Sequence, residues 1–417
     1  MKKINSEQTR RSFLGNLSKA GLLGITGLAP LAASAASPKV RVSATPDNPE
    51  HAFLCKPYLQ VPAPDTIAVM WLTSRPCYSW VEYGTDGQLN HKAHHVTKGL
   101  VDANNRLHRI ELDNLEPGKQ YSYRVLSKEI TDFQPYKLTY GNTITSDTYA
   151  FTAPNPQARE VSWLMLNDIH DRPASIPHLL KLNGNDPYDF VFFNGDMFDY
   201  QSDEQQIIDH LLAPCGDTFS THIPFMYVRG NHETRGKYAR EWHQYFDNPG
   251  HGSYFTFTRG PVHAIVLDTG EDKEDSAPVY AGITDFDSYR EEQARWLEKQ
   301  LQSPAYKKAK YKVVLMHIPH YHGGDWHGAT HCRTLFGPLF NKYKIDLLVC
   351  GHTHQYGTYD PVPGQHNYPL VIGGGPQEGK RTLIKIKADQ QQLVLTMLRD
   401  DGTVIKTMTI DAPDKRR

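Results

Sequence analysis

The chain has 417 residues, and its 45 Lys and Arg side chains nearly balance its 46 Asp and Glu side chains, which leaves a formal net charge of −1. This balance argues against a nucleic-acid partner, because proteins that bind nucleic acid carry a marked basic excess. The hydrophobic content of 39% excludes a disordered chain, and the length favours two to three domains. After the first 40 residues no apolar run reaches about 18 residues, so we expect no membrane span in the mature chain.

Residues 1–35 have the three parts of an export signal. Arg10 and Arg11 precede an apolar segment, and Ala33-Ser34-Ala35 offers a cleavage site of small residues. The paired arginines resemble a twin-arginine signal, and an ordinary signal or an uncleaved anchor is the alternative. We therefore expect a bacterial protein exported to the periplasm or the cell exterior, with residues 36–50 as a linker.

Residues 51–153 have the pattern of an all-β domain. Apolar and polar residues alternate with period two over residues 66–72 and 79–83, and no helical period interrupts the segment. The spacing from Leu115 to Tyr121, with Pro117-Gly118 between them, is typical of a tyrosine corner, in which the tyrosine hydroxyl bonds to upstream backbone. We predict an immunoglobulin-like or fibronectin-type-III-like β-sandwich.

In residues 154–417 the predicted strands alternate with helices, which is typical of an α/β domain. We expect strands at 161–167, 190–193, 224–228, 312–316 and 345–349, a hairpin over 253–267, and helices at 174–182, 203–212, 237–246, 289–301 and 334–343. Two further strands, 382–386 and 393–397, are expected to complete the second sheet. In α/β sheets the functional site lies beyond the carboxyl ends of the strands.

Potential metal ligands follow five of these strands. The seven candidates are Asp168, His170, Asp196, Asn231, His317, His352 and His354. Carboxylate, amide and imidazole donors suit Zn, Mn or Fe. Seven ligands are too many for one tetrahedral zinc. They suit two divalent ions about 3.5–4 Å apart when one carboxylate bridges the ions. Such a pair of ions activates water and binds the oxygens of a phosphoryl group. Gly195, Gly230 and Gly351 would permit close backbone approach beside these ligands.

The same residues form an ordered series of motifs. Asp168-x-His170, Gly195-Asp196-x-x-Asp199, Gly230-Asn231-His232-Glu233, His317 and Gly351-His352-x-His354 resemble the five-block signature of calcineurin-like metallophosphoesterases. Residues 56–60 and 80–84 are similar to the N-terminal domain of purple acid phosphatases. The resemblance implies an αββα-sandwich catalytic domain over residues 154–417, behind the β-sandwich domain.

The resemblance also implies roles for the residues. Asp168, His170 and His354 would hold one metal, Asn231, His317 and His352 the other, and Asp196 would bridge them. His232 would act as a catalytic residue beside the phosphate, either stabilising charge or protonating the leaving oxygen, and Asp199 would hydrogen-bond and orient it. Asn231 and His232 would also contact the substrate. The two cofactor ions are Zn, Mn, Fe or a mixed pair.

Two positions depart from purple acid phosphatases. That family has Gly at the position of His170 and a metal-binding Tyr at the position of Asp199, so we expect no tyrosinate-to-iron charge transfer and no purple colour. In the histidine-rich loop 317–331 we expect His320 or His322 to contact the substrate, and a solvated surface loop is the alternative.

The function predicted from the sequence is hydrolysis of a small phosphate ester by water activated at the two metals. Within the same family, a phosphodiesterase is the alternative to a monoesterase. From another class, the alternative is a glycan-binding protein with a decayed catalytic domain, in which Trp71 and Trp80 would form the platform; packing explains both residues better, because they lie in alternating strands.

Overall fold

The computed structural model describes residues 50–413. The predicted export signal and nearly all of the linker lie outside the described residues. Within residues 50–413 no helix is long and apolar enough to cross a membrane.

The first domain is a β-sandwich, as predicted. Its seven-stranded antiparallel sheet wraps around a single core. The strands are β1 (Tyr58–Ala63), β2 (Thr66–Gly84), β3 (His91–Ala93), β6 (Ala103–Leu112), β7 (Gln120–Gln134), β8 (Lys137–Thr145) and β9 (Tyr149–Thr152), beside a small ladder of β4 (Val96–Thr97) and β5 (Leu100–Val101).

The two strands predicted at 66–72 and 79–83 form the single long strand β2. Its first half pairs with β1 and β6 and its second half with β7, and the register shifts after Leu72. An irregularity of this kind bends a strand, so β2 serves both layers of the sandwich. The tyrosine corner is confirmed: the backbone N–H of Glu116 donates to the Tyr121 hydroxyl at 3.0 Å.

The second domain contains two six-stranded mixed sheets. One has the order β12-β11-β10-β19-β20-β21 and the other β13-β14-β15-β16-β18-β17. The strands of the first sheet are β10 (Val161–Leu166), β11 (Phe190–Asn194), β12 (Phe225–Val228), β19 (Thr382–Ala388), β20 (Gln392–Arg399) and β21 (Val404–Asp411). Those of the second are β13 (Phe255–Arg259), β14 (Val262–Leu267), β15 (Tyr311–Met316), β16 (Leu347–Cys350), β17 (Gly357–Tyr359) and β18 (Leu370–Ile372).

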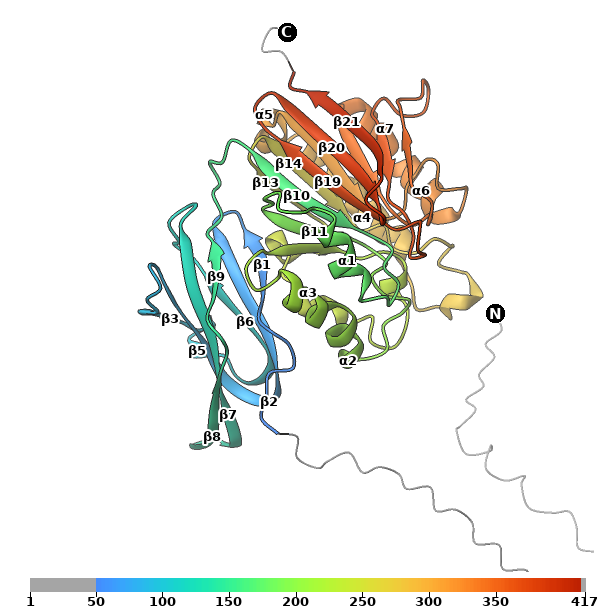
Figure 1. Ribbon diagram of the computed structural model, residues 1–417. Helices are drawn as coiled ribbons and strands as arrows, with labels where there is room; N and C mark the ends of the chain where they lie inside the picture. Colours follow the sequence, from blue (N-terminus) through green and yellow to red (C-terminus); the bar gives the residue numbers. More distant parts are fainter. Residues whose placement is uncertain (1–49, 414–417) are drawn as a thin grey trace, which may run out of the picture. The chain divides into compact units, whose positions relative to one another are not determined.

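Helices cover the outer faces of the two sheets, which gives the αββα order predicted for this domain. One apolar core lies between the sheets, and a further core lies under the helices on each outer face. In Figure 1, α1, α2 and α3 lie against the sheet that contains β10 and β11. The helices are α1 (Ser175–Lys181), α2 (Glu204–Ile207), α3 (Ala213–Thr218), α4 (Phe286–Leu301), α5 (Pro304–Lys308), α6 (His327–Leu335) and α7 (Gly337–Tyr343).

Three predicted elements differ in the structure. Of the helix expected at 237–246, only a 3₁₀ turn forms, at Trp242–Tyr245, because its aromatic side chains turn into the core under α2 and α3. The helix expected at 334–343 is two helices, since Gly337-Pro338 starts a new one. The C-terminal segment forms three strands rather than two, and β19 pairs with β10 in the first sheet, not the second.

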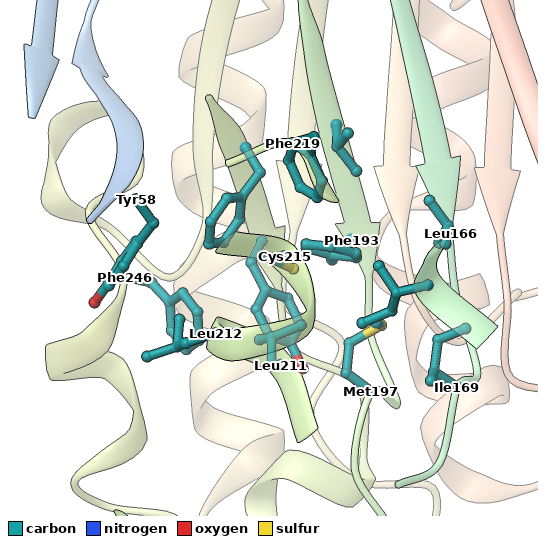
Figure 2. Packing of buried hydrophobic residues seen from close by; sticks show 14 of the residues in the cluster. Tyr58, Leu166, Ile169, Phe193, Met197, Leu211, Leu212, Cys215, Phe219 and Phe246 are labelled. Carbon is teal, nitrogen blue, oxygen red and sulfur yellow. The ribbon is translucent and has the colours of Figure 1, made fainter. Parts of the chain in front are cut away.

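Tyr58 of β1 joins the β-sandwich to the α/β domain. Its ring belongs to the apolar core under α2 and α3, and Figure 2 shows it beside Phe246. Its hydroxyl donates to the carbonyl of Tyr245 at 3.0 Å. The hydroxyl of Tyr123 likewise donates to the carbonyl of Thr221 at 2.8 Å. The sandwich is therefore packed against the side of the α/β domain that carries α2 and α3.

Candidate metal centre

The structure brings all seven predicted ligands together, from the ends of strands in both sheets. Two groups of donor atoms share one carboxylate: Asp168, His170, Asp196 and His354 form the first, and Asp196, His317 and His352 the second. Asn231 joins the second group through its Oδ1, which lies 2.9 Å from Nδ1 of His352. Asp196 is therefore placed to serve two positions at once.

In the first group the donor atoms point at a common centre. Nε2 of His354 lies 2.8 Å from Nε2 of His170 and 3.4 Å from Oδ1 of Asp168. Nε2 of His170 lies 3.6 Å from Oδ2 of Asp196. Two imidazole nitrogens and two carboxylates are the kind of ligands that a borderline divalent ion accepts.

In the second group a backbone carbonyl sets the histidine tautomer. Nδ1 of His317 donates to the carbonyl of Asn194 at 2.7 Å, which leaves Nε2 facing Oδ2 of Asp196 at 3.0 Å. Nε2 of His317 and Oδ1 of Asp168 are buried and form no hydrogen bond. Buried polar atoms without a partner are rare, so the donor set fits bound metal.

The backbone around the ligands is unusual. Five of the seven candidate ligands have positive φ, between 50° and 75°: Asp168, His170, Asp196, His352 and His354. This left-handed conformation costs side-chain-bearing residues about 1–2 kcal/mol each, and such strain gathers at functional sites. A Cβ atom on Gly230 would meet Oδ1 of Asp196 and lie 2.7 Å from Cδ2 of His317, so only glycine fits there.

The charges of the ligands favour a cation at the shared position. Burial alone would lower the pKa of His317, but Asp196 and Asp168 raise it to about 10. The pKa of His170 rises to about 9 for the same reason, against the effect of its burial. The pKa of His352 instead falls to about 4, because it is buried and lies beside His317. The two carboxylates therefore stabilise positive charge between them.

Glu233 holds the loops of the site, a role that the sequence did not reveal. Its buried carboxylate accepts hydrogen bonds from the backbone N–H groups of Asp196, Met197, Phe198 and Gly230 and from the hydroxyl of Tyr227, at 2.6–3.2 Å. It thus fixes the ends of β11 and β12 together. In the sequence, the only indication of this role is that Glu233 directly follows Gly230-Asn231-His232.

The predicted pairing of Asp199 with His232 is wrong about the group involved. The carboxylate of Asp199 bonds to Nδ1 of His170 at 2.8 Å, whereas its backbone carbonyl accepts from Nδ1 of His232 at 2.8 Å. The side chain of Asp199 therefore reaches the loop after β10, which carries His170. Nε2 of His232 lies 3.0 Å from Nη1 of Arg235, a residue that the sequence analysis did not single out.

The two loop histidines proposed as substrate contacts have other partners. His320 is fully buried, and Nε2 lies 2.8 Å from the hydroxyl of Tyr368, so the prediction for His320 is wrong. Its burial lowers its pKa to about 3 and keeps it neutral within the core. His322 is exposed and stacks on Tyr359 at 3.8 Å between ring centroids. A substrate contact of His322 stays a prediction.

Known proteins share both domains with this chain. The calcineurin-like phosphoesterase family matches residues 163–356, and the family named purple acid phosphatase, N-terminal domain, matches residues 54–153. Acid phosphatase type 7 of Mus musculus is 28% identical over 345 residues, which are 74% of this chain and 70% of the mouse protein. Probable purple acid phosphatase 20 of Arabidopsis thaliana is 22% identical over 336 residues, 73% of this chain and 69% of that protein.

The fold is also that of a solved structure. Purple acid phosphatase PPD1 from seeds of yellow lupin, Lupinus luteus, superposes with a TM-score of 0.65 and 17% identity, over 86% of this chain and 74% of the lupin chain. At this identity the likeness concerns the fold alone.

Proposed function

Since the chain combines a calcineurin-like metallophosphoesterase domain with a purple acid phosphatase N-terminal domain, we propose that it hydrolyses phosphate esters at a dinuclear metal centre. The observation that carries this proposal is the shared carboxylate: Asp196 belongs to both groups of donor atoms. In this assignment one ion is held by Asp168, His170 and His354, and the other by Asn231, His317 and His352. Bound there, two divalent ions would activate a water molecule and neutralise charge on a phosphoryl group.

The side chains beside the ligands would position the substrate. The backbone N–H of His232 donates to Oδ1 of Asp196 at 3.0 Å, and its imidazole packs edge to face with that of His170, with 4.6 Å between the ring centroids. Nδ1 of His232 donates to a carbonyl, and because a guanidinium only donates, Nε2 accepts from Nη1 of Arg235. This arrangement suits stabilisation of phosphoryl charge by the guanidinium of Arg235, which His232 helps to orient, better than proton donation by His232.

Arg235 is held for this role by Glu271. The buried carboxylate of Glu271 binds Nε and Nη2 of Arg235, both at 2.9 Å. This two-point contact leaves Nη1 directed at His232 and fixes the plane of the guanidinium. A planar, fixed guanidinium is well suited to the oxygens of a phosphate group.

A substrate panel tests the proposal. The metal-loaded protein is assayed with p-nitrophenyl phosphate and with bis(p-nitrophenyl) phosphate, which separate monoester from diester hydrolysis. We expect hydrolysis that a chelator abolishes, and we expect Asp196→Asn to lose metal and activity together. The matched control Asp217→Asn changes an exposed carboxylate that pairs with Lys56 and should keep both.

The absence of hydrolysis with every metal tested would contradict the proposal, as would activity that survives chelation. Absent hydrolysis together with binding to glycans would favour the alternative of a glycan-binding protein. In the structure Trp71 is fully buried and its Nε1 donates to Ser127 at 2.9 Å, so Trp71 offers no surface for a glycan.

We also propose that the protein is exported through its paired arginines. Arg10→Lys combined with Arg11→Lys should leave the precursor inside the cell. Normal export of this variant would point to the general secretion route instead.

A further inference from the structure

A separate group of metal-ligand side chains lies between α4 and α6. His327 and His331 are one turn apart on α6, and Asp287 is in the first turn of α4. Nε2 of His327 lies 2.8 and 2.9 Å from the two carboxylate oxygens of Asp287, and Nδ1 of His331 lies 3.0 Å from Oδ1. All three donor atoms lie within 4.8 Å of one another, and none of these residues belongs to the centre built on Asp196.

The geometry at His331 is that of a ligand rather than of a hydrogen-bond donor. Nδ1 is buried and forms no hydrogen bond, although a carboxylate oxygen is only 3.0 Å away. A ligand nitrogen in a metal site faces the ion rather than a hydrogen-bond partner, and among the three residues this is the arrangement of Nδ1 of His331. Burial also lowers the pKa of His331, which favours the neutral imidazole that binds metal.

Arg290 holds the carboxylate of Asp287 in place. Its buried guanidinium donates to Oδ1 of Asp287 at 2.9 Å, to the carbonyl of Thr269 at 2.8 Å and to the carbonyl of Glu271. The positive charge of Arg290 should weaken cation binding here relative to the centre at Asp196. The side chains of Asp287, His327 and His331 are 39%, 26% and 18% exposed, so an ion and its water ligands reach them from solvent.

A second histidine–carboxylate group shows what a filled position looks like. Glu111, Asp247 and His251 also gather their donor atoms, but the guanidinium of Arg109 contacts all three residues. The guanidinium of Arg109 thus already occupies the position that a metal ion would take. In the α4–α6 group the guanidinium of Arg290 bonds to the carboxylate of Asp287 and to the backbone carbonyls of Thr269 and Glu271.

We propose that Asp287, His327 and His331 bind a third divalent ion of the zinc class, with water completing its coordination. Two imidazoles and one carboxylate are ligands that zinc accepts. The ion would fasten α6 to α4, which also carries Arg290 and through it the backbone of Glu271. Its expected contribution is to stability, and it stands independently of the proposed phosphoesterase activity.

The test counts ions by difference. Full-length mature protein without a polyhistidine tag is dialysed against buffered ZnCl₂, and zinc per chain is measured by mass spectrometry. We expect His327→Gln/His331→Gln to bind one ion fewer than the wild type and His251→Gln to match the wild type. Asp287→Asn, which keeps a polar side chain in the first turn of α4, should also lose one ion. Added zinc should raise the melting temperature of the wild type by more than it raises that of the double variant.

Because the count is a difference, it holds whatever the centre at Asp196 binds. A zinc content equal to the wild type in both the double variant and Asp287→Asn overturns the proposal. A loss of more than one ion in both variants overturns it as well, since it would mean that these residues support the main centre.

Discussion

Replacing Glu233 with Gln tests how strongly one buried carboxylate supports the site. Oε1 accepts from the N–H groups of Met197 and Phe198 and from the Tyr227 hydroxyl, and Oε2 accepts from those of Asp196 and Gly230. The amide of Gln has one oxygen and one NH₂ group, so either orientation turns a donor toward two backbone N–H groups. Hydrogen bonds to a charged group contribute about 1.5–3 kcal/mol each, and the loss of two predicts about 3–6 kcal/mol.

A loss of this size is a large part of the stability of a typical domain. We expect Glu233→Gln to unfold at clearly lower urea concentration in the metal-free protein and to bind less metal, because the backbone of Asp196 is released. Glu241→Gln is the matched control: Glu241 is exposed and should change stability by less than about 0.5 kcal/mol. If Glu233→Gln unfolds like the control and retains its metal, the role assigned to Glu233 is refuted.

Three further substitutions address separate parts of the structure. His232→Ala should keep the metals and lower the rate about 10²–10³-fold, the scale for losing a group that supports transition-state charge, equally for activated and unactivated esters; a smaller loss with p-nitrophenyl phosphate would indicate that His232 protonates the leaving group. Gly230→Ala should lower metal content because its Cβ would collide with Asp196, whereas Gly364→Ala, with open space around it, should not; equal metal content in the two variants would contradict the steric argument. His263 is buried and its pKa falls to about 4, so the unfolded state takes up a proton first as the pH drops below 6.5. His263 should therefore lower the free energy of unfolding by about 2 kcal/mol at pH 5. Urea unfolding at pH 7 and pH 5 measures this loss, and His263→Phe should lose about 2 kcal/mol less than the wild type between the two pH values. The same pH dependence in both proteins would contradict this role.

The sequence predicted well which candidate side chains the structure brings together, because each follows a strand, and parallel strands deliver their carboxyl ends to one edge. Asp168 and Asp196, for example, follow the neighbouring parallel strands β10 and β11. Roles that depend on the direction of a side chain were harder to predict from the sequence. Asp199 lies near both His170 and His232, and spacing alone does not say which of them its carboxylate reaches.

The same limit explains the errors in the loops. His320 reads as a loop histidine next to a ligand, yet its ring packs against Phe340 and Tyr368 in the core. Glu233, Arg235 and Glu271 act through contacts between segments that are distant in the sequence, and no local pattern marks such contacts. In the fold, the long strand β2 looked like two strands because its alternation is interrupted where its register shifts.

The most direct test of the dinuclear centre is a crystal structure of the metal-loaded protein with anomalous data collected at the absorption edge of the metal. Two anomalous peaks about 3.5–4 Å apart, one on each side of the Asp196 carboxylate, are the predicted result. One peak should lie among His170, His354 and Asp168 and the other among the remaining ligands. A single peak at Asp196, or none, in fully loaded and active protein would contradict the two-metal account.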